Sequence, residues 1–263
     1  MTGHDLRLAS QAAEQAAYAA GTHLLASRSR LAAVVVTRQD PADVTREIDR
    51  ESEALIHEVV LRQFPDHGFR GAGSAARLRD GKPLWVVDAL DGSANYLRGS
   101  AQYAVSIALV VDGEPVVGVV YDPSRNEFFG AIRGRGAVMN GARIRCSAPH
   151  SMLHALAATV CPRPLSTRMT AYMAELGRAL RAFGRVRRSG SRALEMAYLA
   201  AGRIDAFWEH DTGSWDAAAG ILLLRESGSV IEARDDEPLL LSRSLLACTP
   251  GLRGSFLDLL SPA

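Results

Sequence analysis

The sequence predicts a mixed α/β protein, in which an antiparallel sheet packed on helices is followed by a half where strands and helices alternate. Three observations support this fold class. Two segments, residues 5–28 and 49–62, carry apolar residues at the spacing of amphipathic helices. The Asp112-Gly113 pair separates two strand-like runs, as in a tight β-hairpin. Beyond residue 150, short apolar runs alternate with helical segments, which is typical of an α/β arrangement.

The first half is expected to contain two helices followed by a sheet. The helix over residues 49–62 has acids in its first turn, Asp49 among them, where the helix dipole favours them. Phe64-Pro65 ends this helix, because the residue before a proline avoids helical backbone angles. The expected strands span residues 84–88, 104–111, 115–121 and 127–132.

The second half is expected to alternate strands with helices. Gly202 and Gly228 fit the positions just after two helices, where glycine adopts a left-handed conformation without strain. The join is expected near residues 146–152, so that residues 1–148 form the first half and residues 149–263 the second. The expected strands are 156–160, 204–208, 229–232 and 245–248, and the expected helices are 167–182, 191–201 and 215–227.

Composition excludes several classes of function. The chain has 263 residues, a formal net charge of +1 and 22% charged residues, so it carries no charge excess suited to nucleic acid or a membrane surface. It shows no signal-peptide pattern and no apolar run long enough to span a membrane. Cys146, Cys161 and Cys248 lack metal-binding spacing and are expected to be reduced thiols. We therefore expect a cytoplasmic protein with neither nucleic acid nor membrane as a partner.

The segment WVVDALDGSANY, residues 85–96, carries the strongest chemical signal. A buried strand delivers Asp88, and Asp91 follows three residues later. Two close carboxylates repel unless a cation neutralises them, and their hard oxygens suit Mg²⁺, Mn²⁺ or Ca²⁺ rather than zinc. Gly92-Ser93 then opens a helix, whose free N–H groups can bind an anion. Taken alone, the segment also fits a surface turn with a capping serine and two solvated acids.

Further features occur in a fixed order along the chain. They are Asp49, the segment DALDGSAN at 88–95, a G-x-G-A-x-x-N-G turn at 134–141, Glu209, and the segment WDAAAG at 215–220. With these features the sequence resembles the inositol monophosphatase family of Mg²⁺-dependent, lithium-sensitive phosphatases, whose segments read D-P-x-D-G-T-x-N and W-D-x-A-A-G. The resemblance runs from the first helix to near residue 250.

The resemblance implies a layered αβαβα sandwich with the site between the two halves. It implies a phosphomonoesterase that hydrolyses a small phosphorylated polyol or sugar, similar to inositol monophosphate, by means of a metal-activated water. Mg²⁺ is the implied cofactor, with Mn²⁺ as an alternative, and a homodimer is the implied assembly.

The same resemblance assigns a role to each matched residue. The implied metal ligands are Asp88, Asp91, Asp216 and the backbone carbonyl of Leu90. The N–H groups of Gly92 and Ser93 would hold phosphate oxygens, and Asp49 with Ser93 would position and deprotonate the attacking water. Ser191 would lie near the substrate ring, and Glu209 would accept a hydrogen bond from a substrate hydroxyl.

One part of the family pattern is missing. The family places a G-E-E segment before the strand at 84–88, and the first of its two acids is a metal ligand. The matching residues here are Gly71, Ala72 and Gly73, so both acids are absent. Two interpretations follow: an active phosphatase with reduced or altered metal use, or a catalytically weakened paralogue that binds a phosphorylated small molecule in a regulatory or binding role.

Two other features are expected to have no catalytic role. Gly134-Arg135-Gly136 follows a strand but opens no helix, so it resembles a phosphate-binding loop only superficially and does not indicate dinucleotide binding. His210, a single histidine in a polar stretch, is expected to be exposed or hydrogen-bonded.

Overall fold

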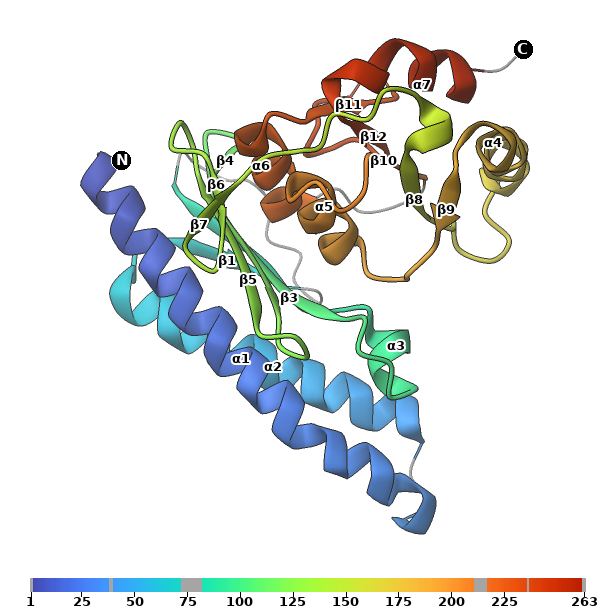
Figure 1. Cartoon of the computed structure of the whole chain (residues 1–263). Coiled ribbons are helices and arrows are strands. Elements are labelled where there is room, and N and C mark those ends of the chain that lie inside the picture. Colours follow the sequence, from blue (N-terminus) through green and yellow to red (C-terminus); the bar gives the residue numbers. More distant parts are fainter. Residues whose placement is uncertain (1, 38–39, 72–81, 211–216, 236, 262–263) are drawn as a thin grey trace.

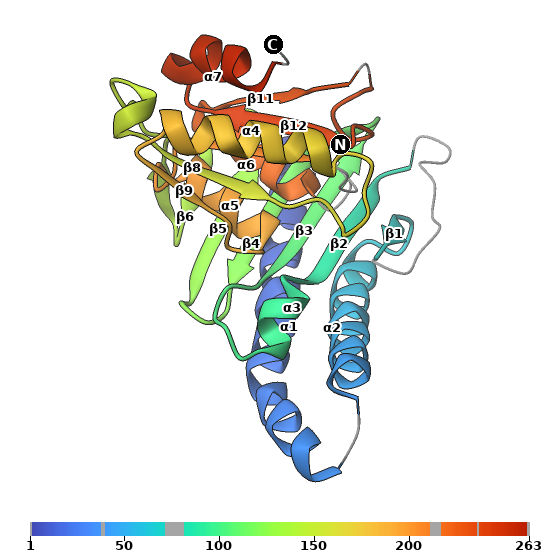
Figure 2. The same cartoon turned by 90° about the vertical axis from the view of Figure 1, so that its right-hand side faces the viewer.

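The protein is arranged in five layers that alternate helices with sheets. The computed structural model describes residues 2–37, 40–71, 82–210, 217–235 and 237–261. In Figures 1 and 2, a helix pair, a sheet, a second helix pair, a second sheet and a third helix pair follow one another. The αβαβα sandwich expected from the sequence is therefore confirmed.

Six helices build the three helical layers. The first pair covers the outer face of the first sheet, the second pair lies between the sheets, and the third pair covers the outer face of the second sheet (Figure 2). The pairs are α1 (Gly3–Thr37) with α2 (Pro41–Gln63), α5 (Arg192–Ala200) with α6 (Ala218–Ser227), and α4 (Met169–Ala182) with α7 (Arg253–Leu260). Among the described helices, none is long and apolar enough to cross a membrane.

The first sheet contains seven strands in chain order. They are β1 (Gly68–Arg70), β2 (Leu84–Asp91), β3 (Ala104–Val111), β4 (Glu114–Asp122), β5 (Glu127–Ile132), β6 (Ala137–Met139) and β7 (Ala142–Ile144). Neighbours are antiparallel except for the parallel pair β1–β2. Asp112 and Gly113 both have positive φ angles, 51° and 78°, which is the tight-turn geometry that the sequence predicts between β3 and β4.

The second sheet contains five strands in the order β11-β12-β10-β8-β9. They are β8 (Leu156–Val160), β9 (Arg185–Arg187), β10 (Ala206–His210), β11 (Val230–Ala233) and β12 (Ser244–Cys248). Strands β9, β8 and β10 are parallel, whereas β12 runs antiparallel to both β10 and β11. The sheet is therefore mixed rather than wholly parallel.

The central core joins the two halves of the sequence. Phe129 of the first sheet, Leu194 and Leu223 of the middle helices and Phe207 of the second sheet are all fully buried in it. Close packing is helped by Gly118 on β4, since a Cβ there would lie 2.9 Å from the carbonyl oxygen of Ala219 on α6. Burying this apolar surface holds the sheets on either side of α5 and α6.

The second helix begins earlier than the sequence pattern predicts. Asp40 caps it by accepting a hydrogen bond from the Ala42 N–H at 2.9 Å, and Pro41 occupies the first helical position, which proline favours. Asp49 therefore lies two turns inside α2, and its expected place in the first helical turn was wrong. α1 likewise continues to Thr37, beyond the expected end at residue 28.

Several short elements escaped the sequence analysis. They are β1, β6, β7, β9, α7 and two 3₁₀ turns, η1 (Met152–His154) and η3 (Pro250–Leu252), whereas the helix expected to open at Gly92-Ser93 is present as α3 (Ser93–Leu97). Most contain too few residues to show a hydrophobic period. β2 also extends to Asp91, three residues past its expected end, because an irregularity in its pairing with β3 allows the strand to continue.

Candidate active site

The two expected metal-binding acids lie at a bulge in β2. The pairing register between β2 and β3 shifts between Asp88 and Asp91, and the intervening Leu90 is buried. The Leu90 N–H donates a hydrogen bond to Oδ1 of Asp88 at 3.2 Å. Bulges redirect side chains at the ends of strands. The strand thus ends with two partly exposed carboxylates just before α3.

Asp91 is held by the N-terminus of α5, which belongs to the other half of the sequence. The Ser191 hydroxyl donates a short hydrogen bond to Oδ2 of Asp91, and the Ala193 N–H donates to the same oxygen at 2.9 Å. Burial raises the pKa of Asp91 above its ordinary value, while the Ser191 hydrogen bond and the charge of Arg192 oppose the rise. Ser191, expected near the substrate, is fully buried and caps α5.

The turn that follows Asp91 requires its glycine. Gly92 has a φ of 85°, and a Cβ there would lie 2.6 Å from the carbonyl oxygen of Gln102. Asn95 fixes the next turn, because its amide donates to the carbonyls of Gln102 at 2.7 Å and Ser189 at 2.9 Å. α3 is therefore tied to the loop that leads into α5.

Asp49 and Ser93, the two expected catalytic residues, line the same cavity. This cavity has a volume of about 270 Å³, and Thr45 and Arg46 also line it. Oδ1 of Asp49 is buried and has no hydrogen-bond partner among the described residues. Burial, reinforced by the negative charge of Glu53, raises the pKa of Asp49 to about 6. A carboxylate with this pKa can accept a proton near neutral pH.

Glu53 is a residue that the sequence analysis missed. It lies one helical turn after Asp49 on α2, and its carboxylate sits so close to Gly71 that a Cβ there would overlap it. Gly71 directly precedes Ala72 and Gly73, where the two expected acids are absent. The i, i+4 spacing from Asp49 was the signal that could have identified it.

Glu209 is fully buried on β10 and forms an ion pair with Arg192, whose Nε lies 2.8 Å from Oε2 of Glu209. The resemblance implies a role for Glu209 at a substrate hydroxyl; in the structure its carboxylate has no exposed surface and lies against the Arg192 guanidinium. Arg192, also missed, directly follows Ser191. The start of α5 therefore binds Asp91 through Ser191 and Ala193, and Glu209 through Arg192.

His210 belongs to a buried polar network rather than to an exposed loop. Its Nε2 lies 2.7 Å from Oε2 of Glu175, and its Nδ1 lies 2.9 Å from the Ser244 hydroxyl. Arg234 completes the network with a 2.7 Å hydrogen bond to Glu175. These contacts connect β10, β12 and α4 at the point where the chain leaves β10, which indicates a structural role.

Part of the predicted metal site lies outside the described residues. This holds for Asp216, the third expected carboxylate, and for Ala72 and Gly73. Within the described ranges, no three His, Cys, Asp or Glu side chains come close enough together to hold a metal ion. The donors that are described, two carboxylates on β2 and an unpartnered buried oxygen on Asp49, are hard oxygens of the kind Mg²⁺ prefers.

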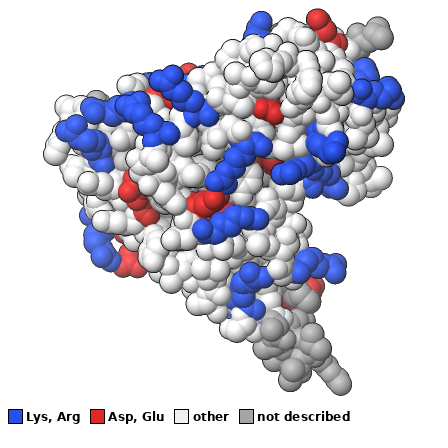
Figure 3. Space-filling model, viewed as in Figure 1, with Lys and Arg blue, Asp and Glu red and all other residues white. Residues whose placement is uncertain are grey.

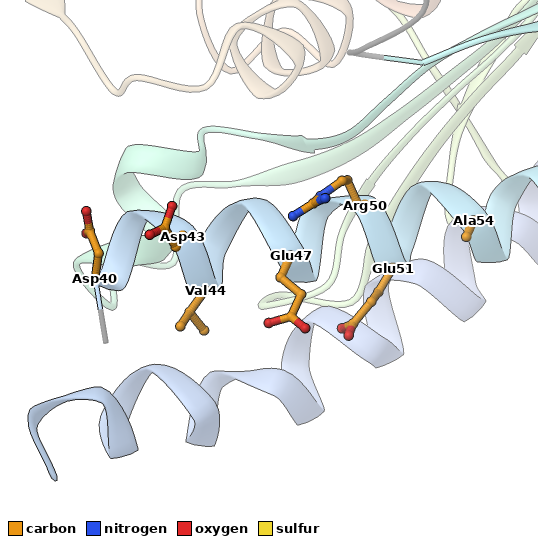
Figure 4. Close-up of a pocket in the computed structure, with 7 residues that line it drawn as sticks. All are labelled: Asp40, Asp43, Val44, Glu47, Arg50, Glu51 and Ala54. Carbon is orange, nitrogen blue, oxygen red and sulfur yellow. The ribbon is translucent and has the colours of Figure 1, made fainter. Parts of the chain in front are cut away.

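A second cavity, of about 710 Å³, lies along an acidic face of α2 and contains none of the predicted site residues (Figure 4). In Figure 4, Glu47 and Glu51 point from α2 toward α1. Arg30 of α1 pairs with both, at 2.9 Å and 2.5 Å. This face is therefore a partly neutralised, solvated surface of the helix pair.

Comparison with known proteins gives consistent matches over nearly the whole chain. The family model for the inositol monophosphatase family matches residues 5–260. An inositol-1-monophosphatase of Rhizobium meliloti is 38% identical over 215 residues, which is 81% of each chain. The Nus factor SuhB of Xylella fastidiosa is 39% identical over 218 residues, covering 82% of this chain and 78% of that one.

The solved structures agree with these matches. The inositol monophosphatase of Anabaena (Nostoc) sp. PCC 7120 superposes with a TM-score of 0.85 at 32% identity, over 97% of this chain and 96% of that one. The sequence similarity therefore covers about four-fifths of each relative, and the fold is shared with the Anabaena protein along almost its full length.

The raised pKa of Asp49 predicts that this residue lowers stability at alkaline pH. A carboxyl group whose pKa rises on folding favours the folded state below its unfolded pKa, near 3.8, and loses that contribution as the pH rises through about 6. Asp49→Asn should therefore stabilise the metal-free protein by roughly 2 kcal/mol at alkaline pH and by almost nothing at acidic pH. Urea unfolding in the presence of a chelator, at acidic and at alkaline pH, measures the difference in the free energy of unfolding. The exposed change Asp258→Asn serves as the control. An equal stabilisation by Asp49→Asn at both pH values would contradict the raised pKa of Asp49.

The buried Arg192–Glu209 pair predicts an asymmetric response to mutation. Arg192→Leu removes the ion-pair partner of the fully buried Glu209 carboxylate and should lower the free energy of unfolding by about 3–5 kcal/mol. Adding Glu209→Leu should restore much of the loss, because no buried charge then remains at that position. Denaturant unfolding of the single and double variants tests this, with exposed Arg188→Leu as the control. A double variant no more stable than Arg192→Leu would show that the pair is not coupled.

Proposed function

Because this chain belongs to the inositol monophosphatase family, we propose that it is a Mg²⁺-dependent phosphomonoesterase that hydrolyses a small phosphorylated polyol or sugar. The observation that supports this most directly is the cavity shared by Asp49 and Ser93. Asp49 keeps a buried, unpartnered carboxylate oxygen, and Ser93 belongs to the turn that follows Asp91. The same resemblance supports a homodimer, and a cytoplasmic location is part of the proposal.

In this proposal, acids from separate segments hold the ion. Asp88, Asp91 and Asp216, with the carbonyl of Leu90, would bind Mg²⁺, and Mn²⁺ could replace it. When bound, the ion supplies positive charge to the phosphate and to the departing alkoxide. The Ser191 and Ala193 hydrogen bonds orient the Asp91 carboxylate before any ion arrives.

Side chains and backbone N–H groups of the protein would activate the water and bind the phosphate. Asp49 would take a proton from the attacking water, with the Ser93 hydroxyl positioning that water between them. A pKa of about 6 keeps Asp49 mostly ionised at neutral pH and still basic enough to accept the proton. The N–H groups of Gly92 and Ser93 would donate to phosphate oxygens, and the positive φ of Gly92 fixes their direction.

A second candidate is a binding protein with little turnover, and the replacement of both expected acids by Ala72 and Gly73 favours it. A protein of this kind would retain the phosphate-binding turn at Gly92 and lose efficient activation of water. The name of the Xylella fastidiosa relative, Nus factor SuhB, fits a role other than catalysis within the family.

Phosphate release from a panel of polyol and sugar phosphates, with Mg²⁺ or Mn²⁺, separates the two candidates. The phosphatase should release phosphate, and Asp49→Asn should reduce the rate by about 10²–10⁴. Asp258→Asn, an exposed change on α7, should leave the rate unchanged. Metal-dependent binding of the same compounds without release would select the second candidate, and the absence of both release and binding would reject the two together.

The missing acids give a gain-of-function prediction. Ala72→Glu with Gly73→Glu should restore a carboxylate ligand, and should tighten Mg²⁺ binding or raise the rate roughly 10- to 100-fold. Ala75→Glu with Ala76→Glu adds the same charge nearby and serves as the matched control. Isothermal titration with Mg²⁺ reports the binding independently of activity. If the first pair behaves like the control, the absent acids do not explain any weakness of the site.

A further inference from the structure

A groove lined by arginines contains none of the predicted site residues. It forms where the turn between β5 and β6 and the strand β7 meet the C-terminal end of α6, and its volume is about 450 Å³. Figure 3 shows Lys and Arg side chains gathered over the β6–β7 hairpin and the N-terminal end of α1. The groove includes Gly134, Arg135 and Gly136, whose sequence alone did not indicate a phosphate site.

Four exposed guanidinium groups line this groove, those of Arg135, Arg143, Arg145 and Arg225. Two carboxylates offset part of their charge. Glu114 pairs with Arg225 at 2.5 Å, and Glu226 forms part of the groove wall. The groove thus retains positive charge although the whole chain is almost neutral.

Glu226 also shows that the turn between β5 and β6 stabilises an anion. The N–H groups of Gly134 and Gly136 donate to its two carboxylate oxygens, at 2.7 Å and 2.6 Å. Both glycines have positive φ angles, so the backbone forms an anion-binding nest. Since Glu226 fills the nest, the arginine side chains remain as the donors that the turn and its neighbours present to solvent.

We propose that this groove binds the phosphodiester backbone of a nucleic acid, a function separate from the proposed phosphatase activity. The planar fork of arginine matches two oxygens of one phosphate, and arginines on both walls of an open groove suit an extended polyanion. None of the described lining residues is aromatic, so the contacts are to phosphates rather than to stacked bases.

Two other ligands fit the groove less well. A single small phosphate compound needs cationic side chains that converge and are buried around it, whereas these four are exposed. An acidic peptide would need the nest that Glu226 already fills, and among the described lining residues Ile144 alone offers appreciable apolar surface for its side chains. The proposal departs from the expectation, based on net charge, that nucleic acid is not a partner, because local charge density governs such contacts.

Fluorescence anisotropy with an oligouridylate of about 20 nucleotides tests the proposal on the full chain. Four phosphate contacts predict binding that weakens roughly 50-fold between about 50 mM and about 200 mM salt. Arg135→Glu with Arg143→Glu and Arg145→Glu should abolish binding at the lower salt concentration. The control variant, Arg163→Glu with Arg168→Glu and Arg181→Glu, has the same net charge and should bind within about threefold of the unmodified protein.

Folding controls, a milder variant and competition experiments separate RNA binding from the alternative explanations. Thermal unfolding of both triple variants establishes that each is folded, and Arg143→Gln with Arg145→Gln provides a milder change that should weaken binding at least about tenfold. If the groove variant and the control variant lose RNA affinity equally, the loss reflects overall charge, and the proposal is overturned. Tripolyphosphate that displaces the RNA at an equal phosphate concentration would also overturn the proposal, in favour of a small anion. Polyglutamate that displaces the RNA at a carboxylate concentration equal to the RNA phosphate concentration would overturn it in favour of an acidic polypeptide.

Discussion

The candidate site depends on the hydrogen bonds between the Asp91 carboxylate and the N-terminus of α5. A half-buried carboxylate is stabilised when donors satisfy its oxygens, and here the Ser191 hydroxyl and the Ala193 N–H supply them. The positive end of the helix dipole adds to this stabilisation. Since Asp91 ends a strand of the first sheet and α5 lies between the sheets, the same contact that orients the acid also joins the two halves of the chain.

The charges described around this contact are not all compensated in the same way. Arg192 sits one residue after Ser191 and balances the buried Glu209. Asp49, by contrast, keeps a buried oxygen without a partner and faces the like charge of Glu53. Such an arrangement lowers stability at neutral pH, and groups of this kind concentrate where a protein performs chemistry. The cavity shared with Ser93 therefore stands out from the rest of the described structure.

Much of the fold was predictable because it follows local patterns. The Asp112-Gly113 turn, the strand leading to Asp88 and the glycine after α6 each follow from a few adjacent residues. The start of α2 could also have been found, since Asp-Pro at residues 40–41 is a recognised helix start, but the acids near residue 49 gave a competing signal.

The site was predictable only in part, because its decisive contacts join distant residues. The sequence indicated Asp88, Asp91 and Ser93, and the structure brings Ser93 into one cavity with Asp49. No local pattern indicates that Arg192 meets Glu209 or that Glu53 lies over Gly71, since those contacts depend on how the layers pack. Asp216 lies outside the described residues, so its place beside Asp88 and Asp91 remains a prediction from the resemblance.

Anomalous diffraction from crystals soaked in Mn²⁺ would locate the ion relative to the carboxylates at the end of β2. We expect an anomalous peak within coordination distance of the carboxylates of Asp88 and Asp91, with Asp216 as a further ligand and the Ser191 hydrogen bond to Asp91 retained. A protein that binds Mn²⁺ elsewhere, or crystals with no peak beside β2 at saturating Mn²⁺, would contradict it.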